Sequence, residues 1–194
     1  MKITIISASM RANSQSLKVS EWLSEHVSSM GAQAKVLDLQ KAGLPMYDGS
    51  DEMALKAKSI LVDLSDSDGF VFVSPEWNGT MSHGLVNLLH FVDHEMAHKP
   101  VMLVGVSAGS GGHYPIMQMR IMNYKNNHFV ISPEALLVQD VNNMLNDHEP
   151  SDGASGSVKK RADYALRILI AYSESLRTVR GCGIVNFKEF RNGV

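Results

Sequence analysis

The residues best placed to do chemistry in this 194-residue chain lie in a short loop, residues 74–80. The loop follows the apolar run 69–73, which has the length and composition of a buried parallel strand. Its proline stops the strand, and its asparagine–glycine pair predicts a tight bend with exposed backbone amides. Ligands of open α/β sheets bind beyond the carboxyl ends of such strands. We therefore expect a planar cofactor here, bordered by Pro75, Glu76, Trp77, Asn78 and Gly79.

A second polar segment, residues 7–16, precedes the first helical pattern and contains four serines, an asparagine and an arginine but no glycine. The lack of glycine excludes the P-loop and the dinucleotide-binding G-x-G-x-x-G pattern. Serine hydroxyls and the amides at a helix start can instead donate to phosphate oxygens, and arginine adds a charge-assisted bond. Such a set suits a terminal monophosphate, although an ordinary helix N-cap has a similar composition. The candidate residues are Ser9, Arg11, Ser14, Gln15 and Ser16.

A third segment, residues 106–112, follows another apolar run and is rich in glycine. Its backbone carries few bulky side chains, so its polar groups can bond the edge of a ring system. A flexible loop between a strand and a helix would have the same composition. The candidate residues are Ser107, Gly109, Gly111 and Gly112.

Taken in order, these three segments resemble the loops of the NADPH-dependent FMN reductase family, which includes chromate, azo and quinone reductases. Residues 74–80 are similar to the family's Pro-Glu-Tyr-Asn-Gly loop, with Trp77 at the tyrosine position. The resemblance implies a flavodoxin-like fold, bound FMN, and NADPH or NADH as co-substrate. It also implies that the backbone of Asn78 and Gly79 lies near the flavin N5, where negative charge develops on reduction. No side chain is expected to act as a catalytic acid or base.

The resemblance further implies a small-molecule electron acceptor, which would be a quinone, an azo compound, a metal oxyanion or free flavin. It weakens in residues 85–90, because the family often has Lys and Asp where this chain has Val86 and His90. That helix commonly contributes to subunit contacts in the family, and here its apolar residues surround much of its circumference. We therefore expect a homodimer or homotetramer that uses this helix.

Apolar runs alternate with helical patterns along the chain, which predicts α/β architecture with a doubly wound parallel sheet. Five such units suit the flavodoxin-like strand order 2-1-3-4-5 in a three-layer αβα sandwich. We expect one domain over residues 1–180, a tail over 181–194 and a polar loop over 142–157. Strands are expected near 2–7, 34–38, 69–73, 100–106 and 135–138, and helices near 15–30, 51–65, 81–97, 113–127 and 157–179.

The composition is that of a soluble globular protein, with 44% hydrophobic and 20% charged residues. A net charge of −2 argues against nucleic acid as a partner, and no apolar run is long enough to span a membrane. The single cysteine, Cys182, fits a reducing compartment, and the first residues do not read as a signal peptide. These features together predict a cytoplasmic protein.

Two other functions remain open on the sequence. One is a zinc hydrolase, because His94, Glu95 and His98 match H-E-x-x-H, the zinc-protease signature, which needs both histidines on one helical face. Because Lys99 and Pro100 end the predicted helix at once, we assign no metal ligand and expect a surface or interface row of titratable histidines that includes His90, with adventitious metal binding left open. The second alternative is a flavodoxin-type electron carrier without a substrate site, although a net charge of −2 offers little acidic surface for docking partners.

Overall fold

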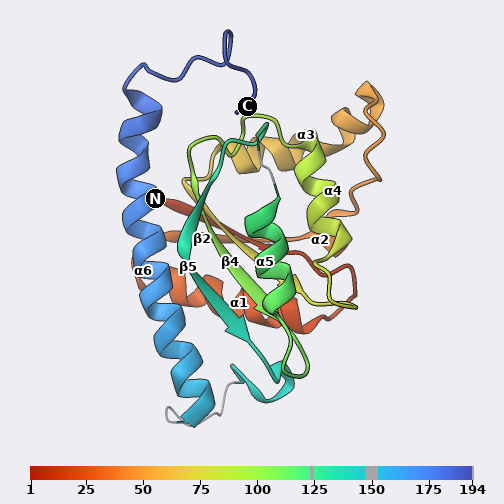
Figure 1. Ribbon diagram of the computed structural model, residues 1–194, viewed down its shortest axis with the longest axis vertical. Helices are drawn as coiled ribbons and strands as arrows, with labels where there is room; N and C mark the ends of the chain where they lie inside the picture. The colour runs from red at the N-terminus through yellow and green to blue at the C-terminus, as the bar shows by residue number, and fades with distance from the viewer. Residues whose placement is uncertain (123–124, 147–152, 194) are drawn as a thin grey trace.

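The computed structural model describes residues 1–122, 125–146 and 153–193. At its centre lies an all-parallel five-stranded sheet with the order β2-β1-β3-β4-β5 (Figure 1). The strands are β1 Lys2–Ser7, β2 Gln33–Asp38, β3 Gly69–Pro75, β4 Pro100–Val106 and β5 Val130–Val138. This order confirms the predicted flavodoxin-like topology, in which the crevice opens beyond the carboxyl ends of β1 and β3.

The central strand β3 is buried along its whole length, and its side chains alternate between two separate cores. Val71 and Val73 belong to one core, whereas Phe70 and Phe72 belong to the other. Each fully buried side chain of this size contributes about 1.5–3 kcal/mol relative to exposure. The continuous apolar run thus fixes β3 between two helical layers and holds the loop after it in place.

Helices cover both faces of the sheet, so the predicted three-layer sandwich is confirmed (Figure 1). Side chains of α1 and α6 form one core with the sheet, and side chains of α3, α4 and α5 form the other. No helix within the described ranges is both long and apolar enough to cross a membrane. The helices are α1 Gln15–Ser29, α2 Leu39–Ala42, α3 Asp51–Ser65, α4 His83–Phe91, α5 His113–Ile121 and α6 Gly153–Gly181, with the 3-10 turn η1 Val141–Asn143.

The helix predicted over 81–97 is wrong at its carboxyl end, because α4 stops at Phe91. The backbone of Val92 is extended, with φ −77° and ψ 126°. The turns that follow still bury Val92, Met96 and Ala97. The spacing of these apolar residues is therefore like that of a helix, although the segment forms compact turns.

Three other predicted boundaries also need correction. The strand predicted over 135–138 starts five residues earlier, at Val130, and contains Pro133 beside a register shift against β4. The helix predicted over 113–127 ends at Ile121, and residues 123–124 of that prediction lie outside the described residues. The loop predicted over 142–157 includes the end of η1 and the first turn of α6, while 147–152 lie outside the described residues.

Candidate functional site

The loops after β1, β3 and β4 meet at the carboxyl edge of the sheet around a cavity of about 400 Å³. This is the convergence that the strand order predicts for ligand sites in open α/β sheets. The cavity is lined by Ser9, Arg11, Ala12, Asn13, Ser14, Gln15, Ser16, Pro75, Glu76, Trp77, Val106, Ser107, Ala108 and Val141.

The cavity wall brings together all the candidates from residues 7–16, together with Pro75, Glu76, Trp77 and Ser107. The remaining five candidates belong to the loops after β3 and β4 but do not line the cavity. These five candidates are Asn78, Gly79, Gly109, Gly111 and Gly112.

The loop after β1 ends in a well-formed helix start. Ser14 is the N-cap of α1, and its Oγ accepts a hydrogen bond from the Leu17 amide at 3.1 Å. Ser9 Oγ accepts one from the Arg11 amide at 3.2 Å, so both hydroxyls keep a proton that can be donated. The amides of Gln15 and Ser16, the first two of α1, precede the first helical hydrogen bond, and the helix dipole makes this end attractive to an anion. The loop therefore presents hydroxyl and amide donors to the cavity.

The Arg11 side chain leans toward the loop after β3 and lies over the indole of Trp77, 4.8 Å from the ring centroid. Within the described part of the chain, no carboxylate pairs with Arg11. A cation over an aromatic face contributes about 0.5–1 kcal/mol at an exposed site. Arg11 thus spans the cavity mouth between the two loops and remains free to bind an anion.

The predicted bend at Asn78 and Gly79 is a two-residue hairpin. Trp77 and Thr80 exchange backbone hydrogen bonds of 3.0 and 2.9 Å. Asn78 and Gly79 have φ values of 50° and 69°, the positive pair that a type I′ turn requires. The hairpin sets the direction of the Trp77 ring at the edge of the cavity.

Serine hydrogen bonds fix this hairpin to the rest of the site. The Ser82 amide donates to Ser74 Oγ at 3.0 Å, and the Ser82 hydroxyl donates to the carbonyl of Ala8 at the end of β1. All three residues are buried. The loop after β3 is therefore tied to the loop after β1 by bonds that water cannot reach.

Sequence reasoning missed the segment after β5, which supports the loop after β4 from behind. The amides of Asp140 and Val141 donate to the carbonyls of Gly109 and Ser107 at 2.9 and 3.1 Å. Gln139 Nε2 donates to the carbonyls of Ser110 and Gly111. No local motif marks this segment, because its role arises only when β5 pairs beside β4.

The H-E-x-x-H segment lies at the opposite, amino edge of the sheet and is not helical. His94 Nε2 lies 3.0 Å from the carbonyl oxygen of Arg191, and the His94 ring stacks on Phe187. Burial, together with nearby His128 and Arg180, lowers the pKa of His98 from its usual 6.5. No group of side chains suited to a metal ion occurs among the described residues. The geometry that a zinc protease needs is therefore missing from this segment.

Comparisons with known proteins match the part of the chain that forms the site. The family model for NADPH-dependent FMN reductases matches residues 1–142, which contain all three loops. An NADPH azoreductase of Bacillus sp. (strain OY1-2) is 29% identical over 117 residues, covering 58% of this chain and 62% of the relative. An NAD(P)H-dependent FMN reductase of Schizosaccharomyces pombe is 30% identical over 124 residues, covering 57% and 60%. The chain thus matches about three-fifths of the length of these relatives.

Among solved structures, an oxidoreductase from Corynebacterium diphtheriae superposes with a TM-score of 0.69 at 15% identity, over 90% of this chain and 97% of that one. At this level of identity the likeness concerns the fold alone. The family match carries more, because it covers well over half of the sequence and every loop around the cavity. The chain belongs to the NADPH-dependent FMN reductase family.

Proposed function

We propose that this chain binds FMN in the cavity at the carboxyl edge and acts as an NAD(P)H-dependent oxidoreductase. The co-substrate would be NADPH or NADH, and the acceptor a quinone, an azo compound, a metal oxyanion or free flavin. The observation that carries the proposal is the cavity itself, which joins a donor-rich helix start, a flat aromatic ring and a glycine-rich loop. The names of the matched relatives, which include azoreductase and FMN reductase, support the same chemistry.

The donors around the start of α1 fit a terminal phosphate. Ser9 and Ser16 are buried residues of the cavity wall, and Ser14, which also lines the cavity, caps α1. Three hydroxyls, the first amides of α1 and the Arg11 guanidinium would share the charge of one phosphate group. The pocket contains no second set of this kind, within the residues described, for the extra phosphate of FAD.

The loops after β3 and β4 fit the ring. FMN, when bound, would accept a hydride from reduced nicotinamide and pass electrons to the acceptor. Pro75 and Trp77 would border the ring, and the loop 107–112 would offer backbone groups to its polar edge. The amides of Asn78 and Gly79 would stabilise negative charge that develops there.

Colour tests this proposal against its alternatives. Purified protein should be yellow, and NADPH should bleach that colour rapidly in the absence of oxygen. Colour that persists with both NADPH and NADH would support an electron carrier. A colourless, zinc-containing protein would support the hydrolase and contradict the proposal.

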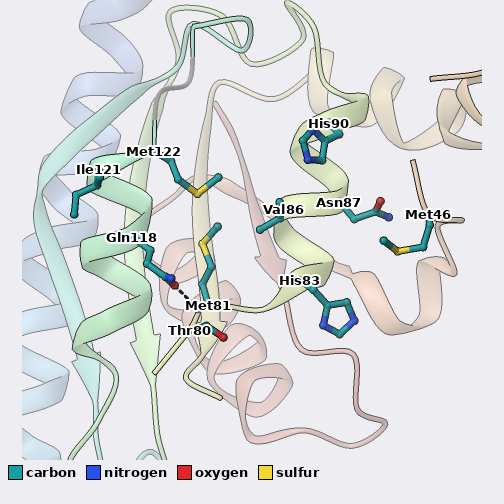
Figure 2. Close-up of a pocket in the computed structure, with 10 residues that line it drawn as sticks. All are labelled: Met46, Thr80, Met81, His83, Val86, Asn87, His90, Gln118, Ile121 and Met122. Atoms are coloured by element: carbon teal, nitrogen blue, oxygen red, sulfur yellow. Dashed lines mark hydrogen bonds between the residues drawn. The ribbon is translucent and has the colours of Figure 1, made fainter. Parts of the chain in front are cut away.

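We also propose that two copies associate through a groove between α4 and α5, giving a homodimer or a homotetramer. The groove has a volume of about 470 Å³, and Figure 2 shows α4 and α5 facing one another across it. It begins at Thr80, next to the hairpin, so a second copy seated there would adjoin the proposed ring site. Its lining is Met46, Thr80, Met81, His83, Val86, Asn87, His90, Gln118, Ile121 and Met122.

The exposed apolar surface that supports this contact lies on α5, whereas the sequence pointed to the helix that contains residues 85–90. The apolar residues of α4 mostly pack inside their own chain, and only Val86 faces the groove. The exposed apolar surface comes instead from α5, where Tyr114, Met117 and Ile121 are 61%, 53% and 77% exposed. These positions fall on one helical stripe.

Sedimentation at micromolar concentration and neutral pH tests the association. We expect a dimer or larger species for the wild-type chain and a shift toward monomer for Ile121→Glu. A Leu55→Glu variant, which changes an exposed leucine on α3, is the matched control and should not dissociate. A wild-type monomer would contradict the proposal.

A further inference from the structure

We propose that Glu76 is a positioning residue that holds the loops after β3 and β4 together by capping α5 from the loop after β3. The inference rests on the proposed function, because it concerns how the chain presents those loops to FMN. It differs from the sequence expectation, in which Glu76 binds the cofactor itself.

The carboxylate of Glu76 faces the first amides of α5. Its Oε2 accepts hydrogen bonds from the amide of Gly112 at 2.5 Å and from the amide of Tyr114 at 3.3 Å. Gly112 is the N-cap of α5 and has no side chain with which to cap it. A carboxylate at this end of a helix also interacts favourably with the helix dipole. Glu76 therefore supplies from the β3 loop the cap that α5 lacks.

The backbone after β4 is shaped closely around this carboxylate. A Cβ at Gly111 would lie 2.9 Å from Glu76 Oε1, too close for an unstrained contact. Gly112 has a φ of 96°, and its carbonyl lies so near Gly105 of β4 that a Cβ there would overlap it. The glycines of this loop thus give Glu76 room to reach the helix, in addition to any role they have toward a ring.

Glu76 is also fixed at its own backbone. Its amide donates to the carbonyl of Val106 at the end of β4, at 2.9 Å. The next residue, Trp77, opens the type I′ hairpin. Main chain and side chain of one residue therefore connect the Trp77 hairpin to both ends of the loop 107–112. Loss of the carboxylate would release the α5 end of that loop and leave the other end in place.

The test uses Glu76→Ala, Glu76→Gln and a control, Glu134→Ala. Glu134 is also half-buried and pairs with Arg161, but it lies outside the cavity wall. Two quantities are measured in each protein: hydrogen exchange of the Gly112 and Tyr114 amides without flavin, and the dissociation constant for FMN. Visible circular dichroism of bound FMN reports whether the ring is held in the same orientation.

In Glu76→Ala we expect both amides to exchange at least about tenfold faster, and FMN to bind about tenfold more weakly with an altered dichroism spectrum. Glu76→Gln keeps an acceptor oxygen but loses the charge, so its effects should be intermediate. Glu134→Ala should match the wild type in both quantities.

Two results would overturn the inference. Weaker FMN binding with unchanged exchange would mean that Glu76 contacts the flavin directly. Faster exchange with unchanged affinity and dichroism would mean that the cap is structural only. If the wild-type chain fails to bind FMN, the proposed function is wrong, and faster exchange in Glu76→Ala would still support Glu76 as the cap of α5.

Discussion

The two edges of the sheet differ in how they treat their polar groups. At the carboxyl edge, hydroxyls, helix amides and the Arg11 guanidinium surround an open cavity, and no described residue in its wall forms an ion pair. At the amino edge, charged groups satisfy one another. Asp68, just before β3, accepts from the Lys2 amide at 2.9 Å and from two nitrogens of Arg177 at 2.6 and 2.9 Å.

A buried lysine beside β4 is also bonded within the chain at this edge. Lys99 is 7% exposed, and its Nζ donates to the carbonyls of Leu64, Ser65 and Glu95 at 3.1, 2.6 and 2.7 Å. Because Leu64 and Ser65 end α3, the ammonium occupies the negative end of that helix. The charged groups of the amino edge therefore bond to one another and to backbone carbonyls of the same chain.

The C-terminal tail also contacts this edge. Figure 1 shows the tail leaving α6 and crossing the end of the molecule toward α3. There Phe187 stacks on His94, and Arg191 pairs with Asp93 at 3.0 Å. The histidine row is thus divided, since His90 lines the α4–α5 groove while His94 contacts the tail. Charged groups are thus paired within the chain at one edge, whereas at the other edge hydroxyl and amide donors border a cavity.

The largest expected effect is on stability, from a change at the amino edge. Asp68→Ala leaves Arg177, Arg180 and the Lys2 amide without their carboxylate, and should lower the free energy of unfolding by about 2–3 kcal/mol. The estimate is below that for a fully buried pair because Arg177 is half-exposed. Urea denaturation measures it. FMN affinity should not change, and a large loss of affinity would break the division between the edges.

The pH dependence of this effect follows from the pKa of Asp68. Burial alone would raise the pKa, but the bonds from Arg177 and Lys2 outweigh it and hold the pKa below 3.8. The stabilisation is therefore complete above about pH 3.8 and is lost as the pH falls through the folded-state value. The exposed pair Lys56–Glu52 is the control for Asp68→Ala, and Glu52→Ala should lower the free energy of unfolding by about 0.5 kcal/mol or less.

A second effect comes from Lys99, whose pKa is lowered by burial from 10.5 to about 8. Between these values the unfolded chain binds more protons, so stability rises with pH, and below about pH 8 the cost of burial is fully present. The wild type should gain up to about 3 kcal/mol relative to Lys99→Met from pH 8 to 10.5. Denaturation curves across this range measure the gain, and parallel curves for the two proteins would show that the pKa of Lys99 is not lowered in the folded chain.

At the carboxyl edge, Arg11→Ala should weaken FMN binding and should lower the free energy of unfolding by no more than the ~0.5–1 kcal/mol of its contact with Trp77. Loss of a hydrogen bond to a charged phosphate weakens binding by about 1.5–3 kcal/mol. Titration of the flavin-free protein with FMN, followed by fluorescence quenching, measures the change. An unaltered dissociation constant would remove Arg11 from the phosphate site and leave it as a partner of Trp77 alone.

The smallest expected effect is that of metal removal. Chelation with EDTA should leave reductase activity intact, because the proposed electron path involves no metal. Activity that EDTA abolishes and zinc restores would show that the histidines of the amino edge are functional.

The sequence predicts the centre of the fold better than its margins. β3 and β4 are continuous apolar runs buried on both faces, a pattern with few other structural solutions. β5 is an edge strand, and Pro133 within it reads as a strand breaker although a register shift accommodates it. The first turn of α6 is rich in glycine and serine, so its composition favours a loop.

The site likewise has a part that the sequence predicts and a part that it does not. Each of the three motifs directly follows a strand, so the parallel topology places them together without further information. The cap from Glu76 to α5 and the support from Gln139 depend on side chains that reach between loops. Because these contacts join residues that are 36 and 28 positions apart, no local sequence pattern predicts them.

The most direct test of the carboxyl edge as a flavin site is a titration of the flavin-free protein with FMN and FAD, followed by anaerobic addition of NADPH. We predict tighter binding of FMN than of FAD, because the donors at the start of α1 suit one terminal phosphate, and rapid bleaching of the flavin absorbance. Equal affinity for the two flavins would contradict the assigned phosphate site. Bound FMN that neither NADPH nor NADH bleaches would contradict the reductase.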